Sequence, residues 1–158
     1  MPDSIANAVI REITPLPVEE PVGSATRRVL DENLPALPAV NADGSFAGIF
    51  GEREFMAALF PGYMNALGSA SMISRTIDEA IERRIGCAEE PIRGYLTTDH
   101  VVLEDDYSDS QLAETFLHHR VLIVPIATKG KIHALVTRGD FFRSLAGRTL
   151  DSIEDVGD

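Results

Sequence analysis

The sequence predicts an α/β (α+β) protein made of two similar β-α-β-β-α units with a helical connector between them. The main observation is an internal repeat: an apolar-proline-apolar string, a glycine turn, an apolar strand and a short helix occur twice in the same order. Pro38 and Pro125 are 87 residues apart, and Phe55 and Phe141 are 86 residues apart. The one-residue difference falls in the turn around Gly130. Self-similarity at a fixed spacing is typical of units that bury one another's faces.

The first copy occupies residues 13–60. Pro15 and Pro17 exclude helix at its start and predict an extended segment. Apolar residues at helical spacing then predict a helix with Ala25, Val29 and Leu30 on its inner side. The remaining predicted elements are a buried strand over 37–40, a hairpin turn over 41–44 with Gly44 suited to positive φ, a strand over 46–50 and a helix over 52–60.

The second copy occupies residues 92–146 and repeats this order. A capping box at Ser108 and Gln111 predicts the start of a helix. The predicted elements are an extended segment over 101–103, a helix with Leu112, Ala113, Phe116 and Leu117 inward, an apolar strand over 121–124, a turn at Lys129-Gly130, a strand over 132–136 and a closing helix over 138–145.

Three further segments complete the predicted organisation. Residues 1–12 are expected to form an N-terminal helix capped by Ser4. Residues 61–91 are expected to form a helical connector, with a capping box at Thr76 and Glu79. Residues 147–158 are expected to be a frayed acidic tail. The apolar stripe predicted for the connector helix consists of Ile77, Ala80, Ile81 and Ile85.

Composition limits the classes of function. The chain has 158 residues and a formal net charge of −11, so its surface repels phosphate backbones and nucleic-acid binding is not expected. No apolar run approaches the ~20 residues of a membrane span, and the N-terminus lacks the pattern of a signal peptide. Cys87 is the only cysteine, which excludes an intrachain disulfide and favours a reducing, cytoplasmic location.

The repeated set of elements, with its Leu-Pro-Ala-Val string, Asp-Gly turn and Gly-Ile-Phe strand, resembles the cystathionine-β-synthase (CBS) domain. Two in tandem resemble the CBS pair, or Bateman module, and the resemblance covers residues 13–60 and 92–146. It implies two units packed about a pseudo-twofold axis, with two clefts that bind AMP, ADP, ATP or S-adenosylmethionine. It also implies a homodimer. We therefore expect a stand-alone CBS pair that acts on a separate, unidentified protein partner.

The resemblance places a ligand site in the second copy. The family signature, a Thr or Ser followed three residues later by Asp, is matched by Thr137 and Asp140. The carboxylate would accept hydrogen bonds from the ribose hydroxyls, and Arg138 with the helix N-terminus would meet a phosphate. The same pair is also an ordinary helix start, with Thr137 as the cap, and the two interpretations are compatible. The other residues expected at this site are Thr97, His100, Val101, Val102, Ile123 and Pro125.

The equivalent positions of the first copy are Gly51 and Glu54. Both residues suit a helix start, but the hydroxyl is missing and the carboxylate is one methylene further from the backbone. The first copy is therefore predicted to hold a degenerate second site.

Catalysis and metal binding are not expected. His118 and His119 are adjacent and would point about 100° apart on a helix, and no nucleophile with a base is evident. No cofactor is required. The leading hypothesis is a non-catalytic sensor of an adenosine nucleotide. The alternative is a ligand-free structural homodimer or interaction module whose clefts are closed by side chains.

Overall fold

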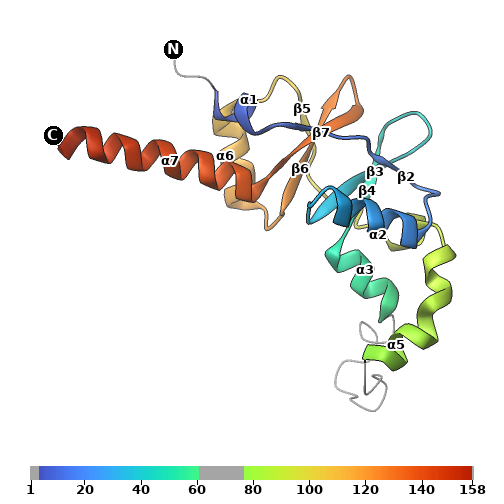
Figure 1. The fold of residues 1–158 in the computed structure, drawn as a ribbon. Helices are drawn as coiled ribbons and strands as arrows, with labels where there is room; N and C mark the ends of the chain where they lie inside the picture. Colours follow the sequence, from blue (N-terminus) through green and yellow to red (C-terminus); the bar gives the residue numbers. More distant parts are fainter. Residues whose placement is uncertain (1–3, 61–76, 158) are drawn as a thin grey trace. The chain divides into compact units, whose positions relative to one another are not determined.

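The computed structural model describes residues 4–60 and 77–157. The chain forms two compact units (Figure 1). One unit comprises Leu16–Asp99, and the other joins Met1–Pro15 to His100–Asp158. Each unit combines a small mixed sheet with helices, which confirms the predicted α/β fold class.

The Leu16–Asp99 unit contains the first copy of the repeat. Its elements are β2 (Leu16–Pro17), α2 (Val22–Asp31), β3 (Ala36–Val40), β4 (Phe46–Gly51) and α3 (Glu52–Leu59), which confirms the predicted β-α-β-β-α order. β2 runs parallel to β3, and β3 runs antiparallel to β4. The helix α5 (Ile77–Arg84) and the 3-10 turns η2 (Ile85–Glu89) and η3 (Ile92–Tyr95) follow.

The other unit contains the second copy. Its elements are α1 (Ile5–Val9), β1 (Arg11–Glu12), β5 (Leu103–Glu104), α6 (Asp109–His118), β6 (Ile123–Thr128), β7 (Lys131–Thr137) and α7 (Arg138–Gly157). β5 runs parallel to β6, and β6 runs antiparallel to β7, as in the first copy. The sheet order is β1-β7-β6-β5.

The two hairpins explain the one-residue difference between the copies. Val40 pairs with Phe46 in the first hairpin, and Gly44 takes a φ of 86° in its loop. In the second hairpin Thr128 pairs with Lys131, and Lys129 and Gly130 both have positive φ, as a two-residue type I′ turn requires. The second copy therefore closes its hairpin with a tighter loop, at the predicted place.

Each sheet is completed by the chain segment that precedes the other copy. Arg11 of β1 pairs with Leu135 of β7, while Thr97 forms an isolated bridge with Ile49 of β4. These segments satisfy backbone groups along the outer edges of β7 and β4. As a result, residues 13–15 and 92–99 lie in the opposite unit from the one that the linear repeat assigns them to.

The core of the second-copy unit lies between the sheet and the helices α1, α6 and the start of α7. The Phe116 and Phe141 rings stack with centroids 5.6 Å apart. The predicted capping box of Ser108 and Gln111 is present. Leu117 was predicted to face inward, but it is 83% exposed, because it lies about 140° around the helix from the buried Leu112. The buried core residues are Ile5, Ala6, Val9, Leu112, Val124, Ile126, Ala134, Val136 and Phe141.

The N-terminal segment is anchored by one carboxylate. Asp109 accepts hydrogen bonds from the Ser4 hydroxyl at 2.6 Å and from the backbone N–H groups of Ile5 and Ala6 at 3.1 and 2.8 Å. The bond from Ser4 is the largest cause that holds the pKa of Asp109 below its usual range. Ser4 caps α1 as predicted, but the helix ends at Val9 instead of residue 12, because the chain turns into strand β1.

Three predicted details differ from the structure. The closing helix does not end near residue 145: α7 continues to Gly157, so 147–157 is helical where a frayed tail was expected. In α5 only Ala80 is buried, while Ile77 and Ile81 are exposed, and Ile85, the first residue of η2, is exposed as well. Leu30 of α2 is also exposed, and Val22 takes the inner position. The predicted cap Thr76 lies outside the described residues.

Candidate functional site

Most of the predicted site residues gather at one end of the second-copy sheet. Thr137, the last residue of β7, pairs with Ile123, the first residue of β6. His100, Val101 and Val102 lie just before β5, which runs parallel to β6. On the other side of β7, β1 brings Arg11 alongside Leu135. The end of β7 and the starts of β6, β5 and β1 therefore lie along the same edge of the sheet, at the point where α7 begins.

Thr137 and Asp140 form the predicted helix start. The Thr137 side chain is buried, and its hydroxyl accepts a hydrogen bond from the backbone N–H of Asp140 at 3.0 Å. The cap interpretation is therefore confirmed. Arg138 is exposed, and its backbone N–H donates to the carbonyl of Leu122 at 2.9 Å. The cap fixes the first turn of α7 and with it the position of the Asp140 carboxylate.

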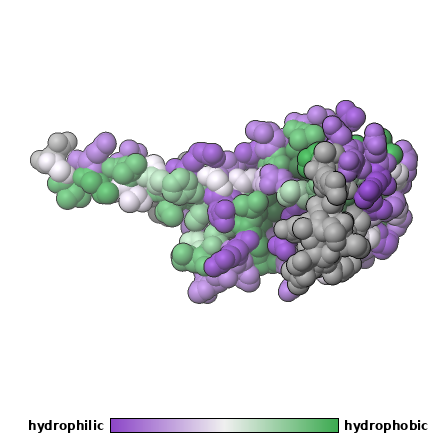
Figure 2. All heavy atoms as spheres, turned by 90° about the horizontal axis from the view of Figure 1, so that it is seen from below, coloured by the Kyte–Doolittle hydropathy of each residue, from purple (hydrophilic) through white to green (hydrophobic). Residues whose placement is uncertain are grey.

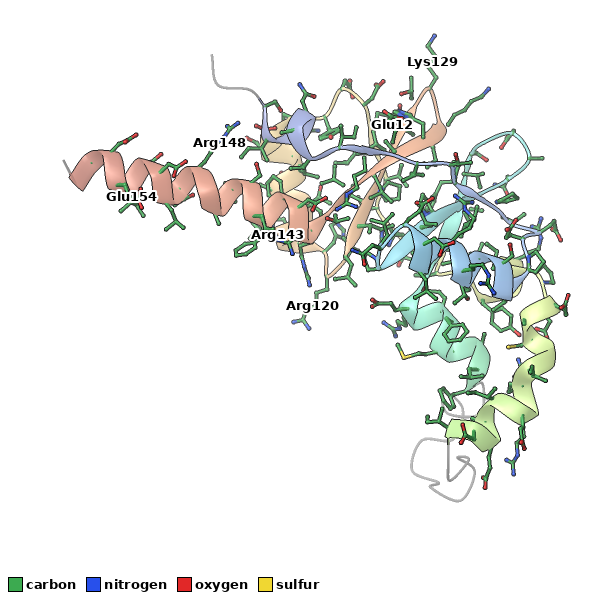
Figure 3. The ribbon with its side chains drawn as sticks, in the orientation of Figure 1. Glu12, Arg120, Lys129, Arg143, Arg148 and Glu154 are labelled. Carbon is green, nitrogen blue, oxygen red and sulfur yellow. The ribbon has the colours of Figure 1, made fainter. Side chains whose placement is uncertain are left out.

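The Asp140 carboxylate lies between two arginines. Arg11 Nε donates to Oδ2 at 2.8 Å, and Arg143 Nη1 lies 3.6 Å from Oδ1. The hydrogen bond from Arg11 is the largest cause that holds the pKa of Asp140 below its usual range, and partial burial opposes it. The carboxylate is therefore ionised at neutral pH and available as a hydrogen-bond acceptor. Figure 3 shows Arg143 at the start of α7.

An open hollow of about 460 Å³ borders this carboxylate. Arg11, Asp140 and Arg143 supply its charged groups, and the end of α1 supplies apolar surface. Its lining residues are Ala8, Val9, Ile10, Arg11, Asp140, Arg143 and Ser144. A hollow with two guanidinium groups beside one carboxylate carries a net positive charge, so it suits a small anionic group in an otherwise acidic chain.

The remaining predicted residues of this unit lie on the other side of β7. Ile123 and Pro125 are buried in β6, and Val101 and Val102 are half-buried. The His100 ring Nε2 lies 3.0 Å from the carbonyl oxygen of Ile123. That carbonyl is thus already engaged by a side chain of the same unit. None of these residues lines the hollow beside Asp140.

Thr97 lies in the Leu16–Asp99 unit, with Gly51 and Glu54 of the predicted degenerate site. Its hydroxyl donates to Glu54 Oε2 at 2.6 Å, and its backbone exchanges hydrogen bonds with Ile49. Glu54 is only 7% exposed. Thr97 is therefore a partner of the predicted degenerate site in the first copy, whose carboxylate it holds.

Gly51 has a structural reason to lack a side chain. The backbone N–H of Glu52 donates to the carbonyl of Pro35 at 3.1 Å, which draws the two segments together. A Cβ built on Gly51 would lie 2.3 Å from the Pro35 oxygen and 2.4 Å from Ala36 Cβ. The hydroxyl that the second copy has at Thr137 therefore has no room here.

Arg11 and Arg143 are two further candidate site residues, which were not among the residues predicted from the sequence. The repeat spacing would have found Arg11, because Arg11 and Thr97 are 86 residues apart and pair with Leu135 and Ile49, which are also 86 apart. In each sheet, the segment that precedes the other copy therefore supplies one side chain that binds a carboxylate in the first turn of the closing helix. Thr97 binds Glu54 of α3, and Arg11 binds Asp140 of α7.

Metal-binding and membrane-spanning features are lacking in the described residues. No group of three or more His, Cys, Asp or Glu side chains within 4–60 and 77–157 is arranged to hold a metal ion. Among the helices of the same ranges, none combines the length and the apolar character needed to cross a bilayer.

Comparison with known proteins identifies the fold. No family model and no curated protein matches the sequence. Among solved structures, the CBS domain of a CBS domain-containing membrane protein from Sphaerobacter thermophilus is 16% identical, with 89% of this chain and 86% of that chain covered and a TM-score of 0.68. CBSX2 in complex with AMP is 13% identical, with 92% and 98% covered and a TM-score of 0.64. CbpB in complex with c-di-AMP is 8% identical, with 94% and 89% covered and a TM-score of 0.63. At these identities the likeness concerns the fold, and the chain has the fold of a tandem pair of CBS domains.

Proposed function

We propose that this chain is a regulatory module that binds a phosphorylated adenosine ligand at Asp140 and transmits the occupancy of that site to a protein partner. The observation that carries the proposal is the ionised Asp140 carboxylate beside an open hollow that also holds Arg11 and Arg143. A carboxylate can accept hydrogen bonds from both hydroxyls of a ribose, and the guanidinium groups can pair with phosphate oxygens.

We propose an orientation for the ligand along the row of strand ends. The ribose lies at Asp140 and Thr137, and the phosphate enters the hollow between Arg11 and Arg143. The adenine extends along Val101 and Val102, as the resemblance to CBS domains implies. Because Arg11 already binds Asp140, the diol replaces the guanidinium at the carboxylate, and Arg11 moves to the phosphate. The exchange keeps both charged groups paired.

Two of the similar structures support a nucleotide as the ligand class. CBSX2 was solved in complex with AMP, and CbpB in complex with c-di-AMP. The candidate ligands for this chain are AMP, ADP, ATP and S-adenosylmethionine, and c-di-AMP joins them. A ligand acts as a switch only if it binds one arrangement of the protein more tightly than another. We propose that the protein does not convert its ligand and that it forms a homodimer. We also propose a cytoplasmic location, which the single cysteine favours.

A second candidate function is a ligand-free structural homodimer. The specific observation in its favour is that side chains of the chain itself already occupy the groups a nucleotide would use. Arg11 binds Asp140, His100 contacts the carbonyl of Ile123, and Thr97 binds Glu54.

Thermal unfolding with a ligand panel separates the two functions. A ligand at about 100 times its Kd adds about 2.7 kcal/mol to the free energy of unfolding, which raises Tm by roughly 5–10 °C for a chain of this size. We expect such a rise for at least one of AMP, ADP, ATP, S-adenosylmethionine and c-di-AMP. Unchanged Tm with the whole panel would favour the structural homodimer.

The matched pair of variants for this experiment is Asp140→Ala and Asp151→Ala. Both remove an aspartate from α7, but Asp151 lies on the exposed polar side of the helix and does not line the hollow. The ligand-induced rise in Tm is expected to vanish in Asp140→Ala and to persist in Asp151→Ala. A rise that persists in both variants would place the ligand elsewhere.

A further inference from the structure

Four polar side chains beside β1 form a continuous chain of contacts, called the His133 network below. The Thr128 hydroxyl donates to Asp105 Oδ2 at 2.7 Å, and Thr128 Oγ1 also lies 2.7 Å from His133 Nε2. On the other side of the ring, His133 Nδ1 lies 3.1 Å from Glu12 Oε2. The network therefore joins β1 to β7, to the end of β6 and to the loop that follows β5.

The number of available protons decides whether the three contacts of the His133 network can form at the same time. Each contact needs one proton, and an ionised carboxylate supplies none. Thr128 supplies one proton and a neutral imidazole supplies one more, which leaves one contact without a proton. An imidazolium supplies two, so all three contacts form only when the His133 ring is protonated.

A neutral ring gives up one partner, and its tautomer decides which one. With the proton on Nδ1, the ring binds Glu12 and accepts from Thr128, whose hydroxyl then no longer donates to Asp105. With the proton on Nε2, the bond between Thr128 and Asp105 remains, but the Nδ1 lone pair faces the Glu12 carboxylate. Loss of the proton therefore costs either the contact with β1 or the contact with the loop after β5.

The charged groups around the ring come from three elements. Glu12 belongs to β1, Asp105 to the loop after β5, and Glu104 of β5 accepts a hydrogen bond from a backbone N–H of the β6–β7 hairpin at 3.3 Å. Lys129 and Lys131 are the cations of that hairpin, and both are exposed. Figure 3 shows Glu12 beside the hairpin that carries Lys129. The carboxylates attract a positive charge on the ring, and the lysines oppose it.

We infer that His133 is a pH sensor that fastens β1 to the sheet when its ring is protonated. β1 has only two residues, both exposed, and successive residues of a strand point to opposite faces. Glu12 contacts His133 on one face, while Arg11 binds Asp140 on the other. The network is complete at the acid end of the range in which histidine titrates, about pH 5 to 8, and loses one contact as the pH rises through it. The sensor therefore sets how firmly β1 holds Arg11 at Asp140.

Solvent exchange of the Ile13 amide tests the inference. This N–H donates to the His133 carbonyl at 3.0 Å, so its protection reports the pairing of β1 with β7. After correction for the intrinsic exchange rate, we expect protection about 2- to 5-fold higher at pH 6 than at pH 8, as an exposed charged contact supports. His133→Gln and Glu12→Gln are each expected to abolish this difference. His118→Gln, which replaces an exposed histidine of α6, is expected to keep it.

Thr128→Val separates the proton count from a simple ion pair. Without the hydroxyl, a ring with one proton on Nδ1 binds Glu12 and has no second partner to satisfy, so the ratio of protection at the two pH values is expected to fall to about 1. Circular dichroism at both pH values verifies that each variant keeps its fold.

Two outcomes would overturn the pH sensor: equal protection of the wild-type Ile13 amide at pH 6 and pH 8, or a pH difference that survives in His133→Gln. The full wild-type difference in Thr128→Val would contradict the three-contact network. No step of the experiment uses a nucleotide, so its outcome is independent of whether the proposed function holds.

Discussion

Arg11→Ala is expected to weaken the binding of AMP about 10- to 100-fold without weakening the binding of adenosine. Arg11 Nε donates to Asp140 Oδ2 at 2.8 Å, so the guanidinium competes with a ribose diol for the same carboxylate. AMP compensates for this competition by offering a phosphate to the displaced guanidinium. Adenosine has no phosphate, so for adenosine the loss of Arg11 removes a competitor and leaves the affinity equal or higher.

Calorimetric titration of both ligands into the wild type and the variant measures this split. Arg27→Ala, an exposed arginine of α2 in the other unit, is the matched control and should change neither affinity. If Arg11→Ala weakened AMP and adenosine by the same factor, Arg11 would act only by positioning Asp140. If neither ligand bound the wild type, the proposed function itself would fail, which is a separate outcome.

Gly51→Ala is expected to lower the free energy of unfolding by about 3 kcal/mol, because there is no space for a Cβ at this position. The added atom would lie 2.3 Å from the carbonyl oxygen of Pro35 and 2.4 Å from Ala36 Cβ. The first neighbour is a backbone atom, and the second belongs to the buried first residue of β3. The backbone segments have to separate to admit it, which weakens the bond from the Glu52 N–H to Pro35.

Urea denaturation of Gly51→Ala beside Gly86→Ala tests this expectation. A Cβ on Gly86 meets no atom within 4 Å, so that variant should stay within about 0.5 kcal/mol of the wild type. Equal stability of the two variants would show that the close approach at Gly51 is not a constraint. The result bears on function as well, because it determines whether the first copy can ever regain a hydroxyl at this position.

The sequence was sufficient for the repeat, the order of elements and the helix start that carries Asp140. Local signals carried these predictions: Gly44 and Gly130 mark the hairpins, Ser108 and Gln111 form a capping box, and Thr137 caps the helix that carries Asp140. Each of these features involves residues close together in the chain, where spacing determines the contact.

The exchange of segments between the two sheets could not be predicted in the same way. Strand β1 contains only Arg11 and Glu12, both exposed, so it has no apolar alternation to reveal it. Its pairing with β7 joins residues more than a hundred positions apart. For this reason the sequence pattern predicts Thr97 at the second-copy site and gives no sign of Arg11, although the 86-residue spacing relates the two positions.

The length of α7 was missed for a different reason. Acidic residues dominate 151–155, and their charge suggested a frayed tail, but Leu150, Ile153 and Val156 continue the helical spacing that begins at Phe142. An apolar stripe that remains exposed within one chain, as on this helix (Figure 2), has no core to identify it.

The most direct test of the account is a map of amide chemical shifts in ¹⁵N-labelled protein titrated with AMP. The account predicts that the perturbed amides include Arg11 and the start of α7, Arg138 to Asp140, while Gly51 to Glu54 of the first copy remain unchanged. Perturbations confined to the first copy, or none anywhere at saturating AMP, would contradict it.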